Sequence, residues 1–323
     1  MDGDLLFSTE GEREEARQAI LDLTGLDIAK GHASDGSRNT TYVISESVRP
    51  SVIRVSPASV KDAKTIRGEL MFVDYLREHL RTVCNPVPFD NSLVNPITVG
   101  GKQYFVVVSR KANGISPDGD DFNRERVFEL YGAKLGELHV ACRTAAEEGF
   151  RFLRPDWLDA PGFNFTMDDV CENIPADVME IMIRIRDKVA ELPRTPETFG
   201  MIHGDMSPIN TFLDWDDVWL FDFDDSCHHY FMYDNACFLI QAQTAAQQAG
   251  ATFDPVKAFV KGYMSKDQAL PMECWSKDYM ERFFHLRIAS GLWLMQQSRT
   301  AKGIASAKAY GPHVTQALRS FEV

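Results

Sequence analysis

One short run of the sequence, HGDMSPIN, carries side chains that could bind a metal ion and accept a proton. The run begins at His203 and places Asp205 and Asn210 five residues apart. Twelve residues after Asn210, a second acidic run extends from Asp222 to Asp225. Carboxylate and amide oxygens are ligands that Mg²⁺ takes in proteins, usually together with phosphate oxygens and water. The pattern therefore predicts a magnesium site assembled from two neighbouring loops.

The charge of this part of the chain supports the same interpretation. Residues 203–234 include eight aspartates and no glutamate, lysine or arginine. Like charges a few ångströms apart repel by roughly 1 kcal/mol or more, even at a high effective dielectric constant. A bound cation would relieve that repulsion, with Asn210 and Asp222 as its natural ligands. Asp224 or Asp225 is the candidate for a further ligand.

Some of these aspartates have a simpler structural explanation. Asp214, Asp216 and Asp217 lie in LDWDDV, which is typical of a solvated hairpin turn. Asp234 follows aromatic residues and precedes a helical pattern, so helix N-capping is favoured over metal binding. A structural role is also the default for each remaining residue of the two runs taken singly. Their joint spacing is what indicates a site.

The composition sets limits on the class of protein. The 323 residues are 44% hydrophobic and 25% charged, which is ordinary for a globular protein with one large domain or two. The net charge of −13 argues against binding to nucleic acid or to an anionic membrane. No apolar run is long enough to span a membrane, and the acidic N-terminus lacks the pattern of a signal peptide. We therefore expect a cytoplasmic protein whose six cysteines, none in a C-x-x-C pair, are reduced.

The first part of the chain predicts a small α+β lobe over residues 1–110. Thr9 and Glu12 form a capping-box pattern ahead of the first helix. Apolar periodicity and turn residues define the other elements. The predicted elements are that helix, ended by Gly25, strands over 39–45 and 51–55, a helix over 60–80, and a hairpin whose strands VNPITV and QYFVVVS flank Gly100 and Gly101.

The rest of the chain, residues 111–323, is predicted to be mainly helical. It begins with the loop KANGISPDGDD, which is rich in glycine, aspartate and proline. Short apolar runs within 199–225 predict a small hairpin, so both acidic runs lie in loops. Helical patterns cover 124–148, 167–191, 234–248, 255–265, 275–297 and 302–319.

These stretches together resemble the aminoglycoside phosphotransferase and choline kinase-like family. The resemblance is carried by LGELH (135–139), IHGDMSPINTFLD (202–214), LFDFDDS (220–226) and YDNACF (233–238). The H-G-D-x-x-x-x-N run with a downstream D-F-D is its specific part. The resemblance implies the bilobal protein-kinase-like fold, with a nucleotide-binding antiparallel-sheet lobe over 1–110. A larger, mainly helical lobe over 111–323 would carry catalysis and substrate binding.

The resemblance also implies roles for the acidic centre. Asp205 would orient and deprotonate the acceptor hydroxyl. Asn210 and Asp222 would hold Mg²⁺ that bridges the phosphates of ATP. The supporting residues would be His203, Asp224 and Asp234, the last through contacts with the backbone of the loop.

In the N-terminal lobe, the resemblance implies a nucleotide site. DGSRNTTYVI resembles the family's nucleotide loop, in which the backbone around Ser37 and Asn39 approaches phosphate. Arg54 stands where protein kinases have lysine, and it can still pair with phosphate bidentately. Glu69 would be its ion-pair partner, and an outward-facing arginine on an edge strand is the alternative. The hinge, with backbone groups facing adenine, would be Ser109, Arg110 and Lys111.

The acceptor would be a small molecule with a hydroxyl group. The acidic surroundings would suit a cationic acceptor such as an aminoglycoside, an amino alcohol, homoserine or hydroxylysine. The run CHHYFMYD could line its side of the site with His228, His229 and Tyr230.

Two other functions remain open at this point. A non-catalytic nucleotide-binding scaffold of the same fold would fit the unusual Arg54 and the unusual Ile209 of the catalytic loop. A protein kinase is disfavoured, because helical sequence begins near Asp234 and leaves no activation segment after Asp222.

Overall fold

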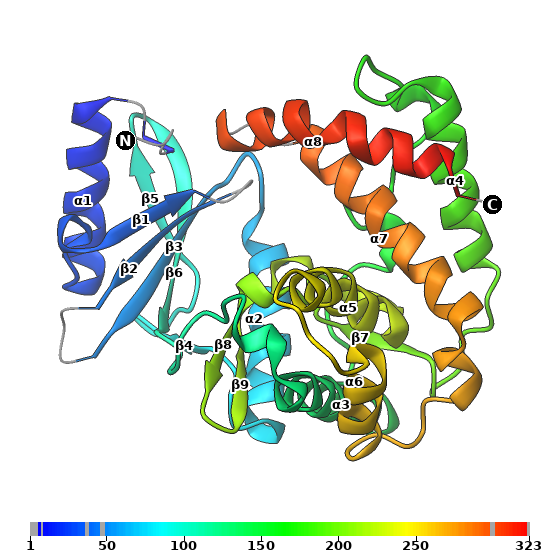
Figure 1. Cartoon of the computed structure of the whole chain (residues 1–323). Coiled ribbons are helices and arrows are strands. Elements are labelled where there is room, and N and C mark those ends of the chain that lie inside the picture. Colours follow the sequence, from blue (N-terminus) through cyan, green and yellow to red (C-terminus); the bar gives the residue numbers. More distant parts are fainter. Residues whose placement is uncertain (1–5, 8, 36–38, 46–48, 298–300, 322–323) are drawn as a thin grey trace.

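The computed structural model describes residues 6–7, 9–35, 39–45, 49–297 and 301–321 and shows a sheet-containing part beside a helical part (Figure 1). The first part follows the predicted order of helix, hairpin, helix and hairpin, with β1 and β4 as additional short strands. Its elements are α1 (Glu10–Thr24), β1 (His32–Asp35), β2 (Thr40–Ile44), β3 (Ser51–Pro57), α2 (Ala63–His79), β4 (Asn85–Val87), β5 (Asn95–Val99) and β6 (Lys102–Arg110).

The sheet is antiparallel and has α1 packed on one of its faces. Its strands run in the order β1-β2-β3-β6-β4, and β5 also pairs with β6. Ile53 and Val55 of β3 are buried in one cluster with Ala16 and Ile20 of α1. Side chains alternate between the two faces of a strand, so Arg54 points the opposite way, toward α2. Because β3 lies between β2 and β6, the edge-strand alternative for Arg54 is wrong.

The first helix begins and ends at the residues that its local signals indicate. The Thr9 hydroxyl accepts a hydrogen bond from the Glu12 N–H, and the Glu12 carboxylate accepts one from the Thr9 N–H. The helix ends at Thr24, and Gly25 follows with a left-handed φ of 71°. The predicted capping box and glycine stop are therefore confirmed.

Helix α2 joins the sheet to the rest of the molecule. Ile66 and Leu70 contact Val107 of β6 in a small cluster. Farther along the helix, Phe72 and Leu76 belong to the large apolar core of the helical part. One helix therefore sets the position of the sheet relative to the helices.

The second part consists mainly of helices and also contains two short antiparallel strand pairs, β7 with β10 and β8 with β9. Its elements are α3 (Glu125–Glu147), α4 (Ala176–Ala190), β7 (Phe199–Ile202), β8 (Thr211–Asp214), β9 (Asp217–Leu220), β10 (Cys227–Tyr230), α5 (Phe231–Gln248), α6 (Pro255–Met264), α7 (Lys277–Gln297) and α8 (Ala301–Arg319).

Two predicted helix starts are wrong. The helix expected from residue 167 begins at Ala176, because Met167–Asp169 forms only a short 3-10 turn and Pro175 caps the helix. The helix expected from Asp234 begins at Phe231, directly after β10. The turn near residue 167 is held by local hydrogen bonds between Thr166 and Asp169, whereas β10 depends on pairing with the distant β7, which helical periodicity does not report.

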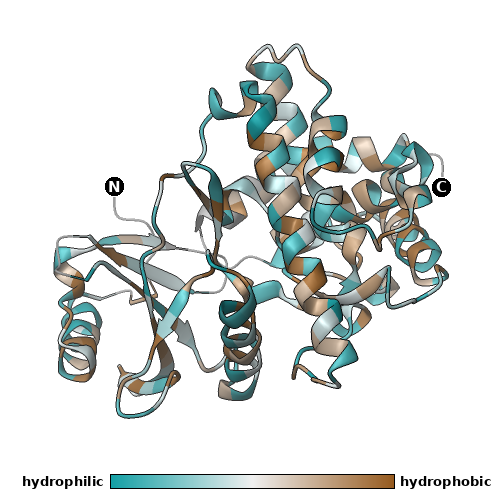
Figure 2. Ribbon diagram, turned by 90° about the horizontal axis from the view of Figure 1, so that it is seen from below, coloured by the Kyte–Doolittle hydropathy of each residue, from teal (hydrophilic) through white to brown (hydrophobic). Residues whose placement is uncertain are grey.

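Helices α3 and α6 of the helical part pack closely against each other. A Cβ atom added to Gly132 of α3 would lie 2.0 Å from the carbonyl oxygen of Phe259 in α6, so only glycine allows this approach. Figure 2 shows that the helices carry both hydrophobic and hydrophilic residues along their length, as expected for helices with one buried face. No helix among the described residues is long and apolar enough to cross a membrane.

Candidate active site

The catalytic-loop candidates lie between β7 and β8. Asn210 Nδ2 donates hydrogen bonds to the backbone oxygen of Asp205 at 2.9 Å and to its Oδ2 at 3.0 Å. These contacts bring the two side chains together in the way that their spacing predicts. Since the amide nitrogen of Asn210 faces Asp205, its amide oxygen points elsewhere and is available as a ligand.

Asp222 lies on the neighbouring loop, directly after β9. The Phe221 N–H donates to the Asn210 backbone oxygen at 3.2 Å, which joins the two loops. Asp222 has φ 64° and ψ 59°, a left-handed conformation that few non-glycine residues adopt. Its side chain is 47% exposed at the open side of the loop. Loss of hydration, caused by the surrounding protein, raises the pKa of Asp222 to about 7, and the negative charge of Asp224 is the second cause.

These donors fit a magnesium ion. A carboxylate and an amide oxygen are hard ligands of the kind that Mg²⁺ prefers, usually one or two from the protein together with phosphate and water. Arg54 Nη1 lies 3.9 Å from Asp222 Oδ1 and offsets part of its charge. Within the described residues, no group of three or more His, Cys, Asp or Glu side chains is placed to hold a metal ion.

Gly204 allows the two loops to touch. Its φ is 87°, and an added Cβ would lie 2.1 Å from the backbone oxygen of Asp225. Any side chain would therefore push the catalytic loop away from the acidic loop. The signal was present in the sequence as H-G-D, but the contact itself depends on the fold.

Asp234 stabilises the start of the catalytic loop by accepting hydrogen bonds from its backbone. It is fully buried, and its carboxylate accepts hydrogen bonds from the N–H groups of His203 at 2.7 Å and Gly204 at 2.9 Å. It lies inside the first turn of α5, whose N-cap is Tyr230, so the N-cap interpretation of Asp234 is wrong. The His203 ring spans the loops as well, with its Nε2 donating to the Phe221 carbonyl at 3.0 Å.

Cations from distant parts of the chain surround the acidic centre, which the sequence pattern does not reveal. Arg287 of α7 donates to Asp205 Oδ1 at 2.6 Å. Lys61, which precedes α2, pairs with Asp224, and Lys134 of α3 pairs with Asp217 at 2.7 Å. Repulsion among the aspartates is therefore relieved partly by side chains. The Lys134 contact also shows that Asp217 is not simply solvated, as the hairpin-turn interpretation expects.

Arg54 and Glu69 form the expected ion pair. Arg54 Nη1 and Nη2 lie 2.8 Å from Glu69 Oε1 and Oε2 respectively, and the side chains are 12% and 5% exposed. Burial disfavours the charge on Arg54, but Glu69 and Asp224 outweigh it and raise its pKa above the usual value. The fork of the guanidinium faces Glu69, so bidentate pairing of Arg54 with phosphate, as expected from the sequence, does not fit this arrangement.

Asp224 shares its contact with Arg54 with the metal candidate Asp222, whose Oδ1 lies 3.9 Å from Arg54 Nη1. Its Oδ1 lies 3.2 Å from Arg54 Nη1 and also contacts Lys61 Nζ, and the residue is 6% exposed. A buried carboxylate between two cations is poorly placed to bind a third. This geometry removes Asp224 from the candidate ligands and leaves it as the link between β3 and the acidic loop.

The other nucleotide-site candidates lie along β2, β6 and the segment after it. Ser109 pairs with Val52 of β3 and Pro86 of β4. The Lys111 N–H donates to the Pro50 carbonyl at 3.0 Å, so this group is not free to face adenine. Lys111 Nζ lies 5.3 Å from the ring centre of Phe212 in β8. Asn39 precedes β2 and is half-buried, and Ser37 lies outside the described residues.

Two of the three residues expected to line the acceptor side lie in the core. His228, His229 and Tyr230 belong to β10, and His229 and Tyr230 are fully buried, whereas His228 is half-buried. The His229 ring stacks on Trp157 at 4.4 Å and on Tyr233 at 4.6 Å between centroids. The expectation that His229 and Tyr230 contact the acceptor is therefore wrong, and the contact expected for His228 stays a prediction.

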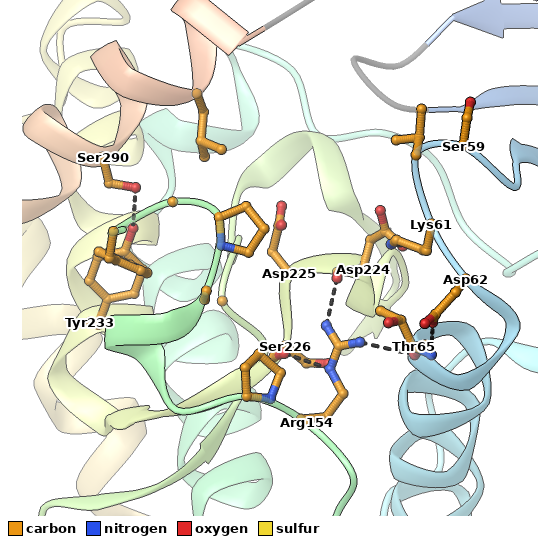
Figure 3. A pocket seen from close by; sticks show the side chains of 18 of the residues that line it. Ser59, Lys61, Asp62, Thr65, Arg154, Asp224, Asp225, Ser226, Tyr233 and Ser290 are labelled. Atoms are coloured by element: carbon orange, nitrogen blue, oxygen red, sulfur yellow. Dashed lines mark hydrogen bonds and ion pairs between the residues drawn. The ribbon is translucent and has the colours of Figure 1, made fainter. Parts of the chain in front are cut away.

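A cavity of about 520 Å³ lies beside the acidic loop (Figure 3). Gly204 of the catalytic loop borders it, and Asp225 points into it (Figure 3). Apolar side chains on α7 and on the segment before α4, including Leu294 and Phe163, complete the wall. The cavity has the size of a small-molecule site.

Arg154, which lines this cavity, connects α2 to the acidic loop. Its guanidinium donates to the backbone carbonyls of Thr65 at 3.1 Å, Asp224 at 2.7 Å and Ser226 at 2.7 Å (Figure 3). The first of these carbonyls belongs to α2 and the other two to the acidic loop. Arg154 was missed by the sequence analysis because all of its partners are distant in the chain.

An antiparallel sheet followed by a helical region, with Asp205, Asn210 and Asp222 gathered on adjoining loops, defines a kinase-like α+β protein. Residues 30–263 match the model of the Phosphotransferase enzyme family, and the chain belongs to that family. The predicted family resemblance and fold class are therefore confirmed.

Similar proteins include an amicoumacin kinase from Bacillus subtilis (strain 168). It is 21% identical over 245 residues, which are 73% of this chain and 71% of the relative. A solved amicoumacin kinase in complex with AMP-PNP, Ca²⁺ and Ami has 19% identity, a TM-score of 0.75 and 96% coverage of both chains. A microcompartment-associated aminopropanol kinase has 20% identity and a TM-score of 0.71, covering 95% of this chain and 96% of its own. These structural likenesses show that the fold is shared.

Proposed function

We propose that the protein transfers the γ-phosphate of ATP to a hydroxyl group of a small-molecule acceptor. The observation that carries this proposal is the meeting of Asp205, Asn210 and Asp222 on two hydrogen-bonded loops. Asn210 contacts Asp205 directly, and the Phe221 N–H joins the Asn210 backbone to the residue before Asp222. Phosphoryl transfer depends mainly on positioning and charge neutralisation, and this arrangement supplies both.

The residues divide the work by their chemistry. Asn210 and Asp222 would hold Mg²⁺, which would supply positive charge to the phosphates of the nucleotide. Asp205 accepts a hydrogen bond from the acceptor hydroxyl and takes its proton as the phosphoryl group is transferred. Arg54, held in place by Glu69, keeps a cation on the sheet side of the site. The nucleotide lies between residues 1–110 and residues 111–323, which act as two lobes.

The acceptor binds in the cavity beside the acidic loop. Gly204, which borders the cavity, immediately precedes the proposed base. Asp225 points into the cavity and provides a carboxylate for a cationic group (Figure 3). An amino alcohol, an amino acid or an aminoglycoside would meet these requirements. The similar proteins named above are kinases of amicoumacin and aminopropanol, which supports a small-molecule acceptor.

The segment after Asp222 disfavours a protein kinase. Only a 3-10 turn, Phe223–Asp225, and the strand β10 separate Asp222 from the start of α5 at Phe231. A bound peptide would need a longer platform there. A non-catalytic scaffold that binds nucleotide remains the alternative, and activity measurements separate it from a kinase.

The test is ADP release with ATP, Mg²⁺ and a panel of ethanolamine, 1-amino-2-propanol, L-homoserine and kanamycin. We expect ADP release above the acceptor-free rate with at least one compound. A thermal-shift assay with ATP and Mg²⁺ reports nucleotide binding separately. Nucleotide binding without acceptor-dependent turnover would favour the scaffold.

A further inference from the structure

Arg287 reaches the proposed base from the helical side of the site. It lies on α7, and its Nη2 donates to Asp205 Oδ1 at 2.6 Å across a sequence separation of 82 residues. The two side chains are 17% and 27% exposed, so water screens the pair only in part. Removing either partner would leave the other charge poorly solvated, which makes this contact more than an incidental surface pair.

The carboxylate of Asp205 is held at both oxygens. Arg287 donates to Oδ1, and Asn210 Nδ2 donates to Oδ2 at 3.0 Å. Rotation of the carboxylate about its Cβ–Cγ bond would break at least one of these hydrogen bonds. Each oxygen can accept two hydrogen bonds, so both keep a lone pair for an acceptor hydroxyl.

Helix α5 contacts α7, the helix that carries Arg287. Tyr233 lies in the first turn of α5. The Tyr233 hydroxyl donates to Ser290 Oγ at 3.2 Å, and Ser290 follows Arg287 by one turn of α7. Tyr233 and Ser290 both line the cavity (Figure 3). Helix α7, which carries Arg287, therefore contacts Asp205 and also forms a wall of the cavity.

We propose that Arg287 is a positioning residue for Asp205 in the phosphotransfer reaction, an inference that rests on the function proposed above. Arg287 fixes the plane of the carboxylate so that a lone pair faces the hydroxyl of an acceptor bound against α7. The base and the acceptor are thus placed by the same helix. Asn210, Asp222 and Arg54 lie on other elements, so nucleotide binding does not depend on Arg287.

The test compares Arg287→Met and Arg287→Lys with the native protein, using ATP, Mg²⁺ and whichever compound of the panel the native protein phosphorylates fastest. Arg287→Met should lower kcat by about 10- to 100-fold, which is part of the contribution of a general base. The KM for ATP should stay within about 2-fold, because only a reacting group has lost its orientation. Arg287→Lys retains the positive charge and can still donate a hydrogen bond to Asp205, so it should recover most of kcat.

The matched control is Arg282→Met, which removes the same charge from an exposed position of α7 and should keep the native kcat. Guanidinium ion added to Arg287→Ala should raise kcat toward the native value, which a general loss of folding would not permit. This second variant keeps the test decisive if Arg287→Met is unstable.

Two outcomes would overturn the inference in distinguishable ways. If the native protein turns over an acceptor and Arg287→Met retains its kcat, the role of Arg287 is wrong and the proposed function stands. A fall in kcat that neither lysine nor guanidinium restores also contradicts positioning. If the native protein releases ADP with no compound of the panel, the proposed function fails, and the role of Arg287 fails with it.

Discussion

Asp222 is the residue on which metal binding depends. Its left-handed backbone turns the carboxylate to the open side of the loop, while Asp224, two residues on, is turned inward to Arg54 and Lys61. The two aspartates of D-F-D share Arg54, whose Nη1 lies 3.9 Å from Asp222 and 3.2 Å from Asp224, but Asp224 also pairs with Lys61. Asp222 is the more exposed of the two, and Asp224 ties the acidic loop to the sheet.

At this scale we predict the effect of Asp222→Asn on nucleotide binding. In the native protein, ATP at about 100 times its Kd should add about 2.7 kcal/mol to the free energy of unfolding. That gain should shrink when EDTA removes Mg²⁺, because phosphate then faces the carboxylates without a bridging ion. In Asp222→Asn with Mg²⁺, the gain in the free energy of unfolding from ATP should be as small as the gain in the native protein with EDTA.

Thermal unfolding with and without Mg²⁺ measures this difference. Asp216→Asn, in the turn between β8 and β9, is a control that makes the same chemical change away from the loops. If Asp222→Asn kept the full Mg²⁺-dependent gain, Asp222 would not be a metal ligand.

At the scale of elements, Arg154 joins α2 to the acidic loop through three backbone carbonyls. Because Glu69 is on α2 and Asp222 is on the loop, this contact sets the distance between the two sides of the nucleotide site. Carbonyl oxygens left without a donor in a buried setting cost about 1–3 kcal/mol each.

We therefore expect Arg154→Met to weaken Mg²⁺-dependent ATP binding by about 10-fold, equivalent to 1.4 kcal/mol, and to lower the free energy of unfolding. Titration calorimetry and urea unfolding measure the two effects. Arg151→Met, an exposed arginine three residues earlier, should change neither quantity. Native ATP affinity in Arg154→Met would show that α2 and the loop are held together by other contacts.

A second prediction at the scale of elements concerns strand β10 and the pH dependence of the free energy of unfolding. Burial lowers the pKa of His229 well below its ordinary value, and its Nε2 has no hydrogen-bond partner among the described residues. The folded state therefore holds the neutral ring, whereas the unfolded chain takes up a proton below about pH 6.5. The stability associated with His229 is present above that pH and is lost as the pH falls through it.

Between pH 7.5 and pH 5.5, one such histidine costs about 1.4 kcal/mol of unfolding free energy. His229→Phe should remove this part of the acid-induced loss, as measured by urea unfolding at the two pH values. His313→Phe, which alters an exposed histidine on α8, should keep the native pH dependence. Equal pH dependence in His229→Phe and the native protein would mean that His229 is protonated in the fold.

At the scale of the whole molecule, the structure shows which features a single sequence can predict. Thr9, Glu12 and Gly25 act on the backbone beside them, so the limits of α1 follow from local chemistry. The short strands β7 and β10 form through pairing with each other, and helical periodicity does not detect them.

Among the active-site candidates, contacts within one loop could be predicted from the sequence, and contacts between distant segments could not. Asp205 and Asn210 lie on one loop, and their contact could be predicted from spacing. The cations Lys61 and Arg287 meet their carboxylates across 163 and 82 residues, so no local pattern indicates them. The cavity likewise draws its walls from many separate segments. Tyr233 of the run CHHYFMYD lines it, whereas the expected His228, His229 and Tyr230 do not.

The most direct test of the account is formation of the phosphorylated acceptor by the native protein and by Asp205→Ala, followed by ³¹P NMR with ATP and Mg²⁺. The native protein should form a phosphate ester of the acceptor. Asp205→Ala should form it at least about 10²-fold more slowly, while its thermal shift with ATP and Mg²⁺ stays close to the native value. Ester formation by Asp205→Ala at the native rate would contradict the assignment of the base and the site built around it.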